Sequence, residues 1–165
     1  MSSTKARSFQ ANVDVLESRE LLSHFPAIDT NQHIYSNVGF GAAEVLSYSR
    51  LPGGGYKASG ALIGVSSSFG VFTGTVSGTV SPSGQGNATA VLHAADGDIL
   101  DLSITGSYGY GSGYHYSKRL TGKFTYTVTG GTGEFAHASG SGPLNVSANL
   151  ATYAVRFNFG GKIKL

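Results

Sequence analysis

The chain has 165 residues, with 40% hydrophobic residues, 12% charged residues, 25 glycines and a formal net charge of +2. This length fits one domain with a core of its own. The small net charge and the scattered basic residues argue against nucleic-acid binding, and the lack of cysteine excludes disulfides, thiolate metal sites and cysteine nucleophiles. No apolar run is long enough for a membrane span.

The N-terminal stretch DVLESRELLS, residues 14–23, is amphipathic and by itself reads as a weakly packed helix of one or two turns. It also resembles a short motif at the N-terminus of many planctomycete extracellular proteins. The matching positions are Leu16, Glu17, Arg19, Leu21, Leu22 and Ser23. The resemblance implies an extracellular or cell-surface location. We expect an export or sorting segment with a linker over residues 1–32 and a single domain over residues 33–165.

After Ile34, apolar residues recur at nearly every second position, which predicts strands with one apolar and one polar face. The clearest runs are residues 98–106, 120–129, 143–150 and 152–160. Residues 41–49, GAAEVLSYS, are read instead as a short helix. In residues 69–80, one face alternates large side chains with Gly70, Gly74 and Gly78, a pattern that suits a tightly curved sheet.

Short turn sequences separate these runs at residues 81–86, 96–98 and 109–113. Short links imply antiparallel neighbours, and closure of the sheet removes its exposed edges. The predicted fold is therefore all-β, an antiparallel, up-and-down, closed β-barrel of about eight strands.

The glycine-rich sequence GGTGEF, residues 130–135, raises the question of a phosphate-binding loop. No Lys-Ser or Lys-Thr follows its last glycine, and no helical pattern comes after it. The pattern favours a turn between two strands, with Phe135 folded back as a plug.

The stretch YTVTGGTGEFAHASGSGPL, with GVFTGTVSGTV and HAADGDIL before it, resembles bacterial relatives of the allene oxide cyclase and dirigent barrels. The resemblance covers residues 56–165. It implies an eight-stranded antiparallel barrel of the calycin type that forms dimers or trimers in characterised branches. It carries over no catalytic residues.

Two groups of titratable residues are candidates for chemistry. The five histidines, His24, His33, His93, His115 and His137, show no metal-ligand spacing, so we predict neither a metal site nor a cofactor. Asp96, Asp98 and Asp101 lie close together around one turn. One interpretation is that two of these carboxylates share a proton and act as acid and base. The favoured reading is a hairpin held by Asx-type hydrogen bonds.

A cluster of tyrosines beside two cations is the best candidate for a contact surface, because tyrosine offers a large contact area at low entropic cost. Its members are Tyr108, Tyr110, Tyr114, Tyr116, Lys118 and Arg119. Cross-strand aromatic packing explains the same residues without a ligand. Three further polar residues could bind a ligand at the barrel rim, namely Glu134, His137 and Arg156. Arg156 lies outside if the apolar face of its strand points inward, and inside if the sheet is reversed.

Two functions follow from these patterns. The favoured one is an exported, non-catalytic barrel that acts in surface binding or assembly, with a surface glycan or protein as partner. The alternative is a barrel that binds a small apolar ligand, as a carrier or as an isomerase or cyclase that imposes shape on its substrate. Neither involves nucleic acid, and both allow a homo-oligomer.

Overall fold

The computed structural model describes residues 34–36, 38–110, 119–149 and 151–165. The predicted export segment, residues 1–32, lies outside the described residues. The strands are β1 (Ile34–Ser36), β2 (Gly39–Arg50), β3 (Tyr56–Ser66), β4 (Gly70–Val80), β5 (Gln85–Ala94), β6 (Ile99–Tyr110), β7 (Arg119–Gly131), β8 (Ser139–Asn149), β9 (Ala154–Phe159) and β10 (Lys162–Lys164). One short 3₁₀ helix, η1 (Gly133–Phe135), lies between β7 and β8.

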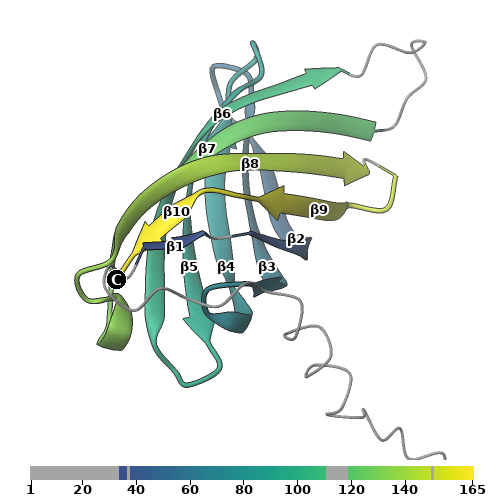
Figure 1. Ribbon diagram of the computed structural model, residues 1–165. Helices are drawn as coiled ribbons and strands as arrows, with labels where there is room; N and C mark the ends of the chain where they lie inside the picture. Colours follow the sequence, from purple (N-terminus) through teal and green to yellow (C-terminus); the bar gives the residue numbers. More distant parts are fainter. Residues whose placement is uncertain (1–33, 37, 111–118, 150) are drawn as a thin grey trace, which may run out of the picture. The chain divides into compact units, whose positions relative to one another are not determined.

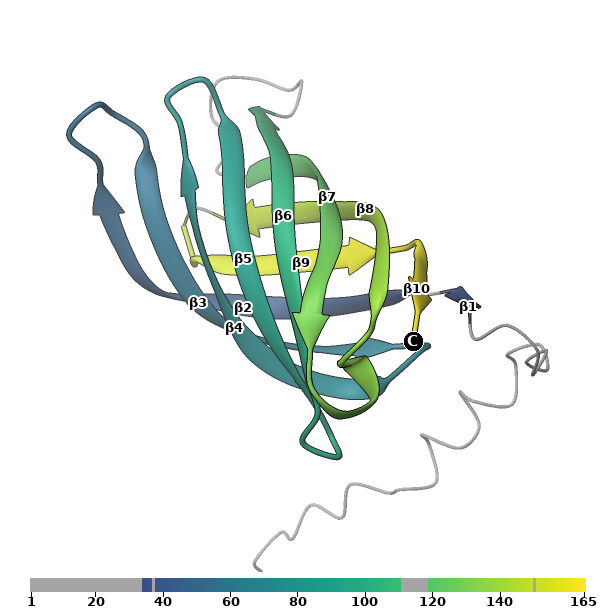
Figure 2. The ribbon, with the colours of Figure 1, turned by 90° about the vertical axis from the view of Figure 1, so that its left-hand side faces the viewer.

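The strands β2 to β9 form a closed antiparallel barrel in which each strand pairs with the next one along the chain (Figure 1). Strand β9 pairs with β8 on one side and with β2 on the other, and this closes the sheet. Strand β10 pairs with the first residues of β8, and β1 pairs with β10. Figure 2 shows the hairpins β2–β3 and β4–β5 extending beyond the closed part of the barrel. The predicted fold class is confirmed.

Alternation along the strands separates a buried inner face from an exposed outer face. On β7, Gly122, Phe124, Tyr126 and Val128 are buried while the threonines between them are exposed. The same alternation places Val155, Phe157 and Phe159 inside and Arg156 outside. The core therefore forms because every second side chain of a curved sheet points to one enclosed space.

Two predictions from the sequence are wrong in detail. Residues 41–49 are strand, part of β2, because residues 41–44 pair with both β3 and β9, and the rest of the stretch pairs with β3 on either side of a bulge. Gly70 does not relieve crowding, since a β-carbon there would meet no atom within 4 Å, and its φ of 71° marks a turn residue. Crowding does explain Gly78, where a β-carbon would stand 2.5 Å from the Ala88 side chain.

One end of the barrel is plugged by apolar side chains. Phe135 of η1 is only 1% exposed, and its ring meets that of Phe69 edge-on at a centroid distance of 5.6 Å. Ile163 of β10 and Leu100 of β6 are equally buried in the same core. The glycine-rich stretch is thus a turn with Phe135 as its plug, as predicted. None of the helices in the described part of the chain could cross a membrane.

Candidate functional site

The barrel interior contains an apolar cavity of about 220 Å³. Its wall combines aromatic rings with small residues, and three of the rings lie near the plugged end. Phe72, Phe157 and Phe159 contribute rings whose centroids lie 6.1 to 6.5 Å apart. Gly60, Gly78, Gly86 and Ala88 line the opposite part of the wall. The small residues leave the space that the large ones would fill.

Few side chains in the cavity wall can ionise. Among the described residues that line it, only Glu44, Tyr108 and Tyr126 have ionisable side chains. Tyr126 is 3% exposed and packs edge-on against Phe159, with ring centroids 6.1 Å apart. The ring of Tyr108 meets that of Phe124 edge-on, with ring centroids 4.9 Å apart, and burial raises the pKa of the Tyr108 hydroxyl. At neutral pH the Tyr108 phenol stays protonated, so the wall offers a hydrogen-bond donor and almost no charge.

A β-bulge changes the direction of the side chains near the open end of the barrel. The register between β2 and β3 shifts between Val45 and Ser47, and Tyr48 then pairs with Ala58. Paired residues point to the same side of a sheet, and Ala58 lines the cavity. The Tyr48 side chain therefore lies on the inner face of the sheet, which lines the lumen. Uninterrupted alternation along β2 would have placed this side chain on the outer face.

Three tyrosines gather at this end, which we call the tyrosine rim (Tyr48, Tyr56 and Tyr153). The rings of Tyr48 and Tyr56 stack with centroids 5.0 Å apart. Desolvation, a hydrogen bond with Tyr56 and the nearby Tyr153 raise the pKa of the Tyr48 hydroxyl. Tyr153 holds a φ of 57°, a left-handed conformation that is unfavourable for an aromatic residue and that recurs at binding sites.

A second hollow, the outer groove, runs across the outer face of β6, β7, β8, β9 and β2 and measures about 590 Å³. Strand pairing aligns Ser107, Lys123, Asn145, Asn158 and Phe40 in one row across these strands. A neighbouring row contains Thr121, Ser147 and Arg156. Of the described residues that line the groove, Lys123 and Arg156 are cationic and none is acidic.

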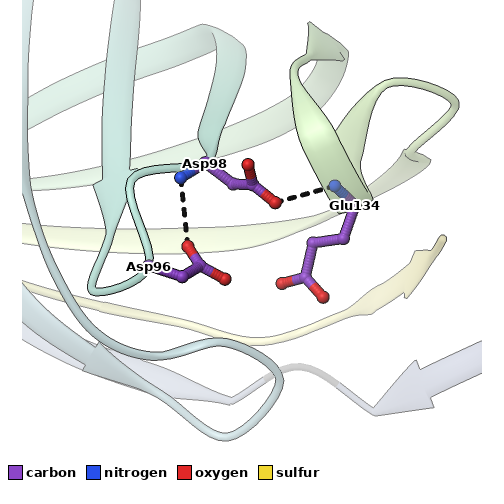
Figure 3. Close-up of side chains that lie close together, drawn as sticks. All are labelled: Asp96, Asp98 and Glu134. Carbon is purple, nitrogen blue, oxygen red and sulfur yellow. Dashed lines mark hydrogen bonds between the residues drawn. The ribbon is translucent and has the colours of Figure 1, made fainter.

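Three carboxylates come together at the plugged end (Figure 3). Oxygen atoms of Asp96, Asp98 and Glu134 lie within 4.8 Å of one another. The Asp98 backbone nitrogen donates to Asp96 Oδ1 at 3.0 Å, and the Glu134 backbone nitrogen donates to Asp98 Oδ2 at 2.8 Å. Desolvation and the two aspartates raise the pKa of Glu134. These bonds tie the β5–β6 turn to η1 and confirm the Asx-type turn.

Of the tyrosines and basic residues predicted as one contact surface, the structure describes the side chains of Tyr108 and Arg119. Tyr108 lines the cavity, and Arg119 is exposed at the start of β7. The side chain of Tyr110 and all of Tyr114, Tyr116 and Lys118 lie outside the described parts of the structure, so this surface stays a prediction.

The three residues predicted at the rim are all exposed but do not converge. Glu134 contacts the β5–β6 turn, and His137 follows η1. Arg156 lies on the outer face of β9, so the reversed-sheet alternative is wrong. His93 is also exposed, on the outer face of β5.

Apolar side chains also form an exposed strip on the outer face of β2, β3 and β4, which we call the apolar strip (Phe40, Ile63, Val65 and Val71). Phe40 pairs with Val65, and Val65 pairs with Val71. Their exposed fractions run from 42% for Val65 to 66% for Phe40. The sequence does not reveal this strip, because these residues belong to the face that carries polar groups elsewhere.

The tyrosine rim and the outer groove were missed as well, and for different reasons. The bulge that redirects Tyr48 leaves no signal in the alternation. The groove joins residues from five strands, and only the register places them together.

Comparison of the chain with protein-family models, with curated proteins and with solved structures found no match.

Proposed function

We propose that this protein is an exported, non-catalytic barrel that binds a small, predominantly apolar molecule in its lumen. The observation that carries the proposal is the apolar cavity of about 220 Å³ between the aromatic plug and the tyrosine rim. The location outside the cell is supported by the N-terminal resemblance at residues 16–23.

The cavity volume restricts the ligand to a narrow size class. An engineered apolar cavity of about 150 Å³ binds benzene, whereas pockets for drug-sized ligands start at about 300 Å³. A volume of about 220 Å³ falls between these values. It suits a single ring with short substituents or a branched short-chain hydrocarbon, with any hydroxyl directed to Tyr108.

The chemistry of the wall favours binding over reaction. General acid–base catalysis needs a group whose pKa lies near the working pH. Burial raises the pKa of the Tyr108 phenol further above that pH, and Glu44 is exposed. The isomerase or cyclase alternative would therefore have to act through shape alone.

Filling the cavity provides the test. Ala88→Leu places a larger side chain in the wall, and Ala61→Leu on the exposed outer face of β3 is the matched control. Toluene and p-cresol are the probes, and the melting temperature at rising probe concentration is the readout. Because a ligand that binds only the folded state raises the melting temperature, we expect a rise for the natural protein and the control and none for Ala88→Leu.

Two results would count against the proposal. One is an equal rise in all three proteins, which would place binding outside the lumen. The other is no rise in any of them, together with a bare 17.0 kDa mass in native mass spectrometry of protein from its own host. Export is tested separately, by fractionation of host cells with an antibody against the barrel.

A further inference from the structure

The outer groove carries two long cationic side chains at separate positions. Lys123 lies on β7 and Arg156 on β9, two strands away and two residues further along the sheet. Neighbouring strands are about 4.8 Å apart, and residues on one face of a strand about 6.7 Å apart, so the two Cα atoms lie about 12 Å from each other. This spacing leaves room for two separate anions, one at each cation.

Neutral hydrogen-bonding groups occupy the space between the cations. Asn145 Nδ2 donates to Asn158 Oδ1 at 3.0 Å. This bond leaves the carbonyl oxygen of Asn145 as an acceptor and the amide group of Asn158 as a donor for a ligand. Hydroxyls of Ser107, Thr121 and Ser147 also line the groove. Such a surface matches a molecule that is rich in hydroxyl groups.

The groove is long, and it ends at an aromatic ring. The row from Lys123 to Phe40 crosses four strands, a span of about 14 Å. Phe40 is 66% exposed, so its ring offers a flat apolar surface at one end. A single sugar would not reach from the ring to Lys123, whereas a chain of sugars would.

We propose that the outer groove binds an acidic polysaccharide, with carboxylates at Lys123 and Arg156 and sugar hydroxyls at Asn145 and Asn158. The guanidinium of Arg156 matches a carboxylate in bidentate geometry, and Lys123 acts as a point charge. Two cations on a chain of net charge +2 are too few for nucleic acid, which needs a dense basic face. This site is separate from the lumen and does not depend on the ligand proposed there.

Calorimetric titration of the full chain with oligogalacturonate tests the proposal. We expect binding that weakens with added salt, and a loss of roughly tenfold or more in affinity for Lys123→Ala and for Arg156→Ala. Arg156→Lys should lose less, because it keeps the charge. Lys57→Ala, an exposed cation on β3 outside the groove, is the control and should bind like the natural protein. All substituted residues are exposed, and melting curves verify that the variants fold.

A fully methyl-esterified oligogalacturonate separates charge from shape. This neutral oligomer should bind weakly, and with the same affinity to the natural protein and to Arg156→Ala. Asn158→Ala should lower the affinity for both the acidic and the esterified oligomer. The proposal is wrong if the acidic oligomer does not bind, or if it binds the Lys123→Ala/Arg156→Ala double variant as tightly as the natural protein. The proposal is also wrong if a single-stranded oligonucleotide competes with the acidic oligomer as well as that oligomer competes with itself. A change in the mass of the native assembly in Arg156→Ala would likewise contradict it, because the groove would then be a contact between copies of the chain.

Discussion

The ring of Phe72 on β4 lies over Gly64 on β3, its direct partner across the two strands. A β-carbon at Gly64 would stand 2.5 Å from Cζ of Phe72. The pair Gly41 and Phe157 repeats the arrangement between β2 and β9. Glycine on one strand thus makes room for an aromatic ring from the next, and this lets a strongly curved sheet enclose large side chains.

Gly64→Ala should destabilise the barrel, because the added methyl group meets both the Phe72 ring and a β2 backbone carbonyl. Overpacking of this kind costs about 1–3 kcal/mol, which corresponds to a fall of on the order of 5 °C in melting temperature. Gly53→Ala is the control, since a β-carbon there would meet no atom within 4 Å. Equal melting temperatures for the two variants would contradict the crowding argument.

Phe135→Ala should remove the plug of the barrel. Its side chain is 1% exposed, and truncation of a buried aromatic side chain costs about 3–5 kcal/mol. Guanidinium unfolding monitored by circular dichroism measures the loss. His137→Ala, an exposed neighbour after η1, should change the free energy of unfolding by less than about 0.5 kcal/mol. A similarly small loss at Phe135 would show that the core does not depend on it.

Glu134→Gln should stabilise the protein at neutral pH. Desolvation and the carboxylates of Asp96 and Asp98 raise the pKa of Glu134 in the folded state. Above its folded-state pKa, the ionised Glu134 carboxylate therefore lowers the free energy of unfolding. This destabilisation disappears as the pH falls below the unfolded-state pKa of about 4.3, because the carboxyl is then protonated in both states. Because Glu134 is exposed, screening keeps the gain below about 1 kcal/mol.

Melting curves of Glu134→Gln and the natural protein across pH test this linkage. The difference should be largest near pH 7 and vanish near about pH 3. Glu44→Gln, outside the three-carboxylate cluster, is the control for the loss of one charge. A difference that grows toward low pH would have the wrong sign and would contradict the assignment.

Homo-oligomer formation, which the sequence resemblance implies, is tested at the apolar strip. If copies of the chain meet there, Val65→Lys combined with Ile63→Lys should convert the assembly to a 17.0 kDa monomer, because buried unpaired charges oppose association. Both residues are exposed in the single chain, so folding should persist. Light scattering after gel filtration measures the mass, with Thr89→Lys on β5 as control. A natural protein that is already monomeric would exclude the strip as a homo-oligomer interface.

The sequence alone determined the strand character, which side chains of a strand share a face, the antiparallel order and the turn before Phe135. These properties follow from local physics, since alternation along one strand decides which side chains share a face. The same reasoning failed at residues 41–49, where small residues gave no strong preference and pairing with β3 and β9 decided the outcome.

Only the tertiary structure decided which distant residues become neighbours. Glu134 meets Asp98, 36 positions earlier, because η1 folds over the β5–β6 turn. Lys123 and Arg156 share a groove because two antiparallel pairings, β7 with β8 and β8 with β9, bring their strands together. Tyr48 turns toward the lumen because of a one-residue bulge. Register and closure are set by the sum of many long-range contacts, and no short stretch of sequence carries that information.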